Sequence, residues 1–237
     1  MRVNNMKEDL PKVPLKYLFY FFSIAIIGAS RKKGKVGHSI LSNLTNNDYP
    51  GSIYPVNPKA DEIMGYTCYD KVSDIPDDVD IALVAVPAKI VPSVIEDAGK
   101  SGVKFAVVTA SGFSEIGNIE EEKKIVEIAH KHGMRILSPN IFGVYYGPKS
   151  MNATFGPSDV EPGNIALISQ SGALGNALIE KTVMEEIGLS AIASVGNKAD
   201  ITEVELLKYL KNDSHTKAIV IYLEGTKKGR ELIKVAR

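Results

Sequence analysis

The sequence predicts an α/β protein built on a doubly wound parallel sheet. Short apolar runs alternate with amphipathic runs along nearly the whole chain of 237 residues. Several short runs are almost continuous in Ile, Val and Ala, which is typical of parallel strands covered by helices on both faces. Gly102 and Gly133 directly follow two of the amphipathic runs, as glycines often follow helices. The alternation therefore favours repeated strand–helix–strand units.

The first series of elements predicts a domain over residues 15–156. The expected strands are Ile24–Ile27, Ser52–Val56, Ile81–Val86, Phe105–Thr109 and Arg135–Leu137. The expected helices are Val36–Leu44, Lys59–Met64, Ile90–Ser101 and Ile119–His132.

A second series follows a stretch rich in Pro and Gly, which predicts a linker over residues 157–163. The expected strands are Ile165–Ile168, Ala191–Ser194 and Ala218–Leu223, and the expected helices are Ala173–Glu186, Glu203–Lys211 and a last one from Lys228 onward. Doubly wound domains commonly have five or six strands. We therefore expect residues 164–237 to form only part of a domain, in a chain that is truncated at its C-terminal end.

Composition excludes several classes of protein. Lys+Arg and Asp+Glu balance at 28 each, which argues against a general binder of nucleic acid or of anionic membranes. The apolar run before Gly28 has no cleavage motif and is shorter than the roughly 20 residues of a membrane helix. The single cysteine, Cys68, excludes an internal disulfide and fits a reducing cytosol. We expect a cytoplasmic protein that binds neither nucleic acid nor a membrane.

The first strand ends in the turn "IIGASRKKGKVG", which resembles a phosphate-holding turn before a helix. Ser30 stands where a dinucleotide-binding turn has its second glycine. At the end of the next strand, where an NAD site has an acidic residue, the chain has Asn57, Pro58 and Lys59. A lysine there attracts phosphate, so the turn favours an adenosine nucleotide with a phosphate near its ribose, such as CoA or NADP. A solvated basic loop is the alternative.

Further turns fall at the carboxyl ends of expected strands, where doubly wound sheets bind their ligands. Pro87 follows the third strand, Ser111 and Gly112 follow the fourth, and Asn140 follows the fifth. Each turn alone is a weak signal, but their shared position at strand ends is specific.

The stretch "LISQSGALGNAL" predicts a strand, a tight turn and a helix. The hydroxyls and backbone N–H groups of this turn would bind phosphate at the positive end of the helix; they belong to Ser169, Ser171, Gly172 and Ala173. A nucleophilic serine is the alternative, but no glycine precedes Ser171 by two positions, as the hydrolase motif requires. "SVGNKADIT" places Asp200 where it can cap the following helix.

Together these motifs resemble the CoA-binding half of ADP-forming acyl-CoA synthetases, which are similar to the succinyl-CoA synthetase α subunit. The resemblance covers roughly Phe19 to Arg237 and implies a Rossmann-like CoA-binding domain followed by a flavodoxin-like domain. It also implies the residues that lie along CoA: Gly28, Ser30, Lys35, Val36, Asn57, Lys59, Pro87, Ser111, Gly112 and Asn140. The family's G-P-N-C-x-G motif departs here, with Ser138 in place of glycine and Ile141 in place of cysteine.

The resemblance implies the reaction acyl-CoA + ADP + phosphate ⇌ acid + CoA + ATP, through acyl phosphate and phosphohistidine. It gives Glu224 the role of stabilising the phosphorylated histidine, although a solvated loop glutamate is the alternative. ADP or ATP with Mg²⁺ would enter through an ATP-grasp β subunit or a downstream domain, and the assembly would be oligomeric.

None of the four histidines matches the family's phosphorylated one, which lies beyond Arg237. We therefore expect the chain alone to be inactive as an acid–CoA ligase. Two alternatives stay open: a stand-alone CoA-binding protein and an NADP-binding oxidoreductase. His130 and His132 have a metal-like spacing, but no third ligand cluster accompanies them, so we expect no metal site.

Overall fold

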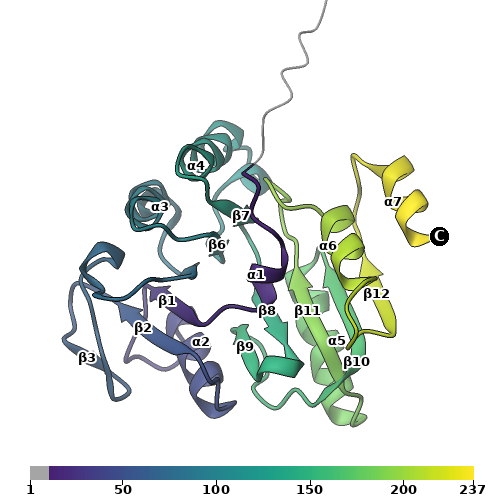
Figure 1. The fold of residues 1–237 in the computed structure, drawn as a ribbon, viewed down its shortest axis with the longest axis horizontal. Helices are drawn as coiled ribbons and strands as arrows, with labels where there is room; N and C mark the ends of the chain where they lie inside the picture. The colour runs from purple at the N-terminus through teal and green to yellow at the C-terminus, as the bar shows by residue number, and fades with distance from the viewer. Residues whose placement is uncertain (1–10) are drawn as a thin grey trace, which may run out of the picture.

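The computed structural model describes residues 11–237 and contains two five-stranded sheets that lie side by side (Figure 1). The N-terminal half of the chain forms most of the first sheet with its helices, and the C-terminal half forms the second. None of the helices among these residues is long and apolar enough to span a membrane.

The first sheet is entirely parallel, with the order β2-β1-β5-β6-β7. Its strands are β1 (Ser23–Ile27), β2 (Ser52–Val56), β5 (Ile81–Val84), β6 (Phe105–Val108) and β7 (Arg135–Leu137). The strand order reverses direction between β1 and β5, and this is the point at which doubly wound sheets bind ligands. The predicted doubly wound sheet is thus confirmed.

Alternate residues of each strand point to opposite faces of this sheet, so two sets of helices cover it. Ile24 and Ile26 pack with α2 (Val36–Asn46) on one face, while Ala25 and Ile27 share a core with α3 (Val91–Lys100) and α4 (Ile119–Lys131) on the other. This burial on both faces explains the near-continuous apolar runs in the sequence. Short 3₁₀ turns occur at Val72–Asp74, Ala88–Ile90, Ser114–Ile116 and Gly147–Lys149.

The predicted helix Lys59–Met64 is wrong. This segment forms a small antiparallel hairpin of β3 (Glu62–Ile63) and β4 (Tyr66–Thr67). Met64 and Gly65, between the strands, have φ of 54° and 84°. Two consecutive residues with positive φ are typical of the tight turn that matches the twist of a hairpin, and they are incompatible with a helix.

The second sheet has the order β12-β10-β11-β8-β9. Strands β10 (Pro162–Ser169), β11 (Leu189–Ser194) and β12 (Ala218–Tyr222) are parallel, whereas β8 (Gly143–Tyr146) and β9 (Met151–Thr154) are added antiparallel. Helix α5 (Gly172–Met184) shares a core with one face of this sheet, α6 (Glu203–Leu210) shares a core with the other, and α7 (Gly229–Ala236) follows β12.

Sheet membership does not change at the expected linker. β8 and β9 precede residue 157 but belong to the second sheet, and Pro162 and Gly163 already lie in β10. The sheets therefore divide between β7 and β8, and the proposed domain ranges 15–156 and 164–237 remain a prediction about folding units.

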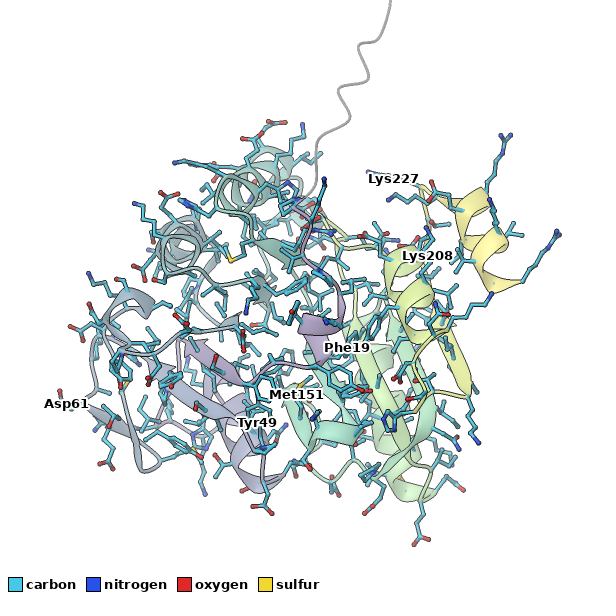
Figure 2. All side chains as sticks on the ribbon, in the orientation of Figure 1. Phe19, Tyr49, Asp61, Met151, Lys208 and Lys227 are labelled. Atoms are coloured by element: carbon cyan, nitrogen blue, oxygen red, sulfur yellow. The ribbon has the colours of Figure 1, made fainter. Side chains whose placement is uncertain are left out.

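One hydrophobic core joins the two sheets. It contains Phe19 of α1 (Lys16–Phe19), Ile26 of β1, Met151 of β9 and Leu206 of α6. Figure 2 shows Phe19 and Met151 in the middle of the molecule, between the sheets. The segment before β1 thus helps to fix the two halves against each other.

Candidate functional site

A cavity of about 730 Å³ lies at the carboxyl ends of β1, β2 and β5 in the first sheet. Five of the residues predicted to contact a nucleotide line it: Gly28, Lys35, Asn57, Lys59 and Pro87. The cavity occupies the point where the strand order reverses, which is the expected position for a ligand.

The turn after β1 is held by backbone geometry and by Asn57. Gly28 has a φ of 90°, and a Cβ added there would lie 2.5 Å from the carbonyl oxygen of Ala85, so only glycine fits. Asn57 donates from Nδ2 to the carbonyl oxygen of Ala29 at 2.8 Å, and its Oδ1 accepts from the backbone N–H of Lys59 at 3.0 Å. Asn57 thus ties the end of β2 to the turn after β1.

Ser30 lies in this turn but does not line the cavity. Its hydroxyl accepts from the backbone N–H of Lys32 at 3.0 Å, and its carbonyl oxygen lies 2.9 Å from Nδ1 of His38. Lys35 and Val36 follow as the N-cap and first residue of α2. The exposed lysines at this helix start make it favourable for an anion.

Gly37 is a residue of this site that the sequence interpretation missed. A Cβ added to Gly37 would lie 2.1 Å from the carbonyl oxygen of Gly28, so helix α2 can pack this closely on the first turn only with glycine here. In dinucleotide-binding turns the third glycine has this packing role. Its spacing from Gly28, longer than in G-x-G-x-x-G, concealed it.

We expect Gly37→Ala to destabilise the protein and to weaken the binding of ligands in this cavity, because the methyl group forces α2 away from Gly28. Overpacking of this kind costs about 1–3 kcal/mol, which a urea titration followed by circular dichroism measures. Gly229→Ala is the matched control, since its nearest heavy atom would be Cγ2 of Thr226 at 3.8 Å. Equal unfolding midpoints for the two variants would contradict the packing role of Gly37.

The turns after β6 and β7 lie beside the cavity without lining it. A Cβ on Gly112 would lie 3.0 Å from Cβ of Ala88, next to Pro87, and Ser111 is exposed. Asn140 has a φ of 61°, and its backbone N–H donates to the carbonyl oxygen of Ala110 at 2.8 Å. The turns after β5, β6 and β7 are therefore contiguous at one edge of the sheet.

Asn197 of the second half reaches this edge. Its Nδ2 donates to Glu115 at 2.6 Å and to Glu122 at 2.7 Å, and Asn140 donates to its Oδ1 at 3.4 Å. Burial alone would raise the pKa of Glu115, but the N–H of Gly112 and the amide of Asn197 outweigh it and hold that pKa below its ordinary value. The loop after β11 is thus joined to the turns of the first sheet.

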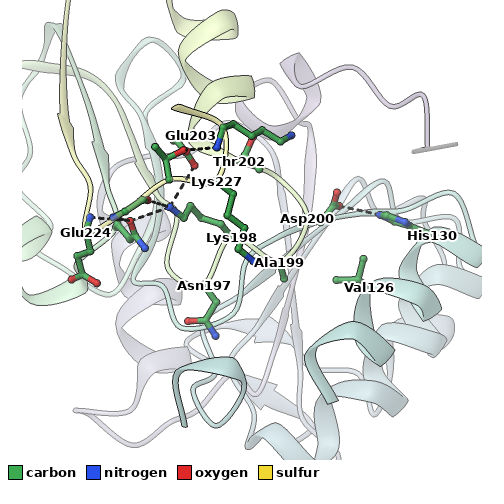
Figure 3. A pocket seen from close by; sticks show the side chains of 14 residues that line it. Val126, His130, Asn197, Lys198, Ala199, Asp200, Thr202, Glu203, Glu224 and Lys227 are labelled. Atoms are coloured by element: carbon green, nitrogen blue, oxygen red, sulfur yellow. Dashed lines mark hydrogen bonds and ion pairs between the residues drawn. The ribbon is translucent and has the colours of Figure 1, made fainter. Parts of the chain in front are cut away.

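A second cavity, of about 650 Å³, lies at the carboxyl ends of the parallel strands of the second sheet (Figure 3). It is lined by the loops after β10, β11 and β12 and by α4, and Glu224 is among its residues. Glu224 is exposed, and its backbone N–H donates to Oε1 of Gln170 at 3.0 Å.

The predicted phosphate turn precedes α5. Ser171 is the N-cap, and its hydroxyl accepts from the backbone N–H of Leu174 at 3.2 Å. The hydroxyl of buried Ser169 donates to the carbonyl oxygen of Ser171 at 2.8 Å. Within residues 11–237, the backbone N–H groups of Gly172 and Ala173 have no acceptor, so this helix start can receive an anion.

The histidines lie in other surroundings. His130 contacts Asp200 at 3.3 Å on the far side of the second cavity from Glu224, as Figure 3 shows. His132 contacts Glu96 at 3.1 Å, so the H-x-H pair has separate partners. The ring of His215 lies edge-on to that of Tyr146.

Asp200 pairs with Arg135 instead of capping α6, so that expectation is wrong. Nη2 of Arg135 lies 2.8 Å from Asp200 and 3.0 Å from Glu205. The capping residue of α6 is Thr202, in a capping box with Glu205.

Comparisons with known proteins agree with this architecture. Residues 23–147 match the model of a CoA binding domain, and residues 162–237 match that of a succinyl-CoA ligase like flavodoxin domain. The α subunit of acetate–CoA ligase [ADP-forming] I from Pyrococcus furiosus is 54% identical over 94% of this chain, and acetate–CoA ligase [ADP-forming] from Methanocaldococcus jannaschii is 48% identical over 94%. This chain spans 50% and 31% of those two proteins.

A solved structure has the same fold. It is described as Ca. Korarchaeum cryptofilum dinucleotide forming acetyl-coenzyme A synthetase 1 in complex with phosphate and ADP. It is 55% identical with a TM-score of 0.91, over 94% of this chain and 48% of that one. The chain therefore belongs to the family of ADP-forming acyl-CoA ligases, in which it corresponds to the part that contains the CoA-binding domain.

Proposed function

We propose that this chain is the CoA-binding and phosphate-handling part of an ADP-forming acyl-CoA ligase. The reaction is acyl-CoA + ADP + phosphate ⇌ carboxylic acid + CoA + ATP, with acetate or a similar small acid as the product. The observation that carries the proposal is the cavity at the strand reversal of the first sheet, in which Lys59 replaces the acidic residue of an NAD site.

In this proposal CoA lies along the turn after β1, with its adenosine and phosphates near Ser30, Lys35, Val36 and Lys59. Its pantetheine arm passes Pro87, Ser111 and Gly112, and its thiol end approaches Asn140. That path leads toward Asn197 and the second cavity, where an acyl group would meet phosphate.

Phosphate is proposed to bind at the start of α5, through Ser169, Ser171, Gly172 and Ala173. Glu224 then stabilises the charged ring of a histidine that carries the phosphoryl group. ADP and ATP, with Mg²⁺, are proposed to bind to an ATP-grasp subunit or domain in an oligomeric assembly in the cytoplasm. The names of the relatives, which include α subunits, support the need for such a part.

Replacing Lys59 tests the CoA assignment. If the lysine contacts the ribose phosphate, Lys59→Glu should weaken the binding of CoA much more than the binding of dephospho-CoA, as measured by isothermal titration calorimetry. A charge-assisted contact contributes about 1.5–3 kcal/mol, so we expect roughly a tenfold to hundredfold loss for CoA.

Lys208→Glu is the control, because Lys208 is an exposed lysine on α6, outside the first cavity. Equal losses for CoA and dephospho-CoA would contradict the role of Lys59. Tighter binding of NADP than of CoA would favour the oxidoreductase alternative and overturn the proposed function.

A CoA-binding protein without ligase activity is the second candidate, because the first cavity lies entirely within the first half of the chain and would bind CoA without the second cavity. ATP formation after addition of the matching ATP-grasp part to the complete protein would exclude it.

A further inference from the structure

The side chain of Lys198 lies between three loops at the carboxyl ends of the second sheet. Its Nζ donates to Oε1 of Gln170 at 3.0 Å and to the backbone carbonyl oxygen of Gly225, and it lies 3.7 Å from Oε2 of Glu203. Only 14% of the side chain is exposed. Figure 3 shows Lys198 pointing toward the segment that carries Glu224.

These contacts stabilise the charged ammonium group. Two of its three N–H donors are hydrogen-bonded, to acceptors at the end of β10 and in the loop after β12, and the carboxylate of Glu203 at the start of α6 forms an ion pair with it. A poorly solvated ammonium is stable only when it is hydrogen-bonded and paired in this way. The arrangement is therefore typical of a lysine that holds loops together and not of a lysine that binds a ligand.

Gln170 extends the effect of Lys198 to Glu224. The side-chain oxygen of Gln170 also accepts from the backbone N–H of Glu224 at 3.0 Å and from that of Gly225 at 3.3 Å. Lys198 thus contacts the segment 224–225 directly at the Gly225 carbonyl and indirectly through Gln170. Loss of Lys198 would free the carbonyl oxygen of Gly225 and would remove the charged donor that orients the side chain of Gln170.

The backbone of Lys198 is itself fixed by the first half of the molecule. Its φ is 58°, and its N–H donates to Oγ of Ser138 at 2.6 Å. Ser138 is fully buried in the turn after β7, two residues before Asn140. A continuous set of contacts therefore runs from the turns around the proposed CoA thiol end to Glu224.

We propose that Lys198 is a positioning residue that holds Glu224 at the second cavity and couples its place to the turn after β7. The inference rests on the proposed function insofar as Glu224 assists phosphoryl transfer. A different role, direct binding of phosphate by Lys198, predicts a different result, because its loss would then weaken phosphate binding without loosening the segment 224–225.

Hydrogen exchange of the complete protein tests the positioning role without any need for activity. In Lys198→Met, the amides of Glu224 and Gly225 should exchange roughly tenfold faster, since a hydrogen-bonded anchor has been lost. Gln170→Leu removes the acceptor of both amides and is the positive control for their exchange, and Lys198→Gln is the second variant if Lys198→Met does not fold. Lys208→Met, at an exposed position on α6, should change neither amide. Unchanged exchange of these two amides in the Lys198 variants would overturn the inference, whatever Gln170→Leu does.

Kinetics then separate this inference from the proposed function. Lys198→Met should lower kcat with an unchanged KM for CoA and for phosphate, and Lys198→Met combined with Glu224→Gln should be no slower than Glu224→Gln alone, because both act through one group. A raised KM for phosphate with unchanged exchange would overturn the positioning role in favour of direct binding. If Glu224→Gln is fully active while Lys198→Met still loosens the segment, the positioning role stands and the catalytic role of Glu224 fails.

Discussion

Arg135→Met is expected to cost about 3–5 kcal/mol of folding stability, because it leaves a buried carboxylate without its partner. Arg135 is 4% exposed, and the side chain of Asp200 is fully buried. Burial alone would lower the pKa of Arg135, but Asp200 and Glu205 outweigh it and raise that pKa above its ordinary value, so the guanidinium remains charged. The loss should appear as a drop of roughly 10 °C in the melting temperature followed by circular dichroism.

We expect a large loss of stability because the ion pair between Arg135 and Asp200 joins the two sheets. Arg135 begins β7, at the edge of the first sheet, and Asp200 follows β11 of the second sheet. Asp200 also accepts from the backbone N–H of Ile136 at 2.8 Å. Lys123→Met is the control, since its ion pair with Glu120 is exposed and should contribute little. A melting temperature as high as that of the control would contradict a stabilising role for the buried pair.

Glu224→Gln is expected to slow phosphoryl transfer in the complete protein by about a hundredfold, the typical effect of removing one group that stabilises charge in an active site. The amide keeps the shape of the side chain but has no charge to offset a phosphorylated histidine ring. CoA affinity should not change, because Glu224 lies at the second cavity and not at the first. Acid-labile label from γ-labelled ATP, supplied through the ATP-grasp part, measures the transfer.

Two comparisons control this experiment. Glu231→Gln alters an exposed glutamate on α7 and should label at the normal rate. The 237-residue chain alone should take up no acid-labile label, because none of its four histidines matches the family's phosphorylated one. Equal labelling of Glu224→Gln and the unaltered protein would make Glu224 a solvated loop residue, and label on His215 would contradict the motif argument.

The pattern of apolar residues along the sequence predicted the strands and helices whose buried residues recur at regular intervals. The strand Arg135–Leu137 is confirmed residue for residue, and the helix predicted at Ile119–His132 ends one residue earlier, at Lys131. The hairpin after Lys59 was missed because its turn depends on positive φ at Met64, a residue that rarely adopts it. Strand β8 was missed because nothing in its own residues indicates pairing with β11, about 45 residues away along the chain, and β9 was missed with it because, within the described part of the chain, β9 pairs only with β8.

The same limit applies to the sites. The positions of Gly28 and Lys59 at the first cavity could be predicted, because each residue lies just after an expected strand. Gly37 and Lys198 could not, because their roles come from atoms of Gly28, Gln170 and Gly225 that only the folded chain brings near. The binding and catalytic roles of all the predicted site residues stay predictions, including those of the five that line the first cavity.

The place of β8 and β9 in the second sheet has a consequence for exchanging modules between ligases of this family. A chimera joined at residue 157, after the matched CoA binding domain, would carry two foreign strands into the neighbouring sheet, where Val144 and Tyr146 pair with β11. A junction between Leu137 and Gly143 would keep each sheet native throughout. Even that design has to preserve the contact between Ser138 and Lys198, which crosses the boundary between the two sheets. Two ligases are therefore suitable for such a chimera when their residues match at this boundary between the sheets, whatever acid each of them activates.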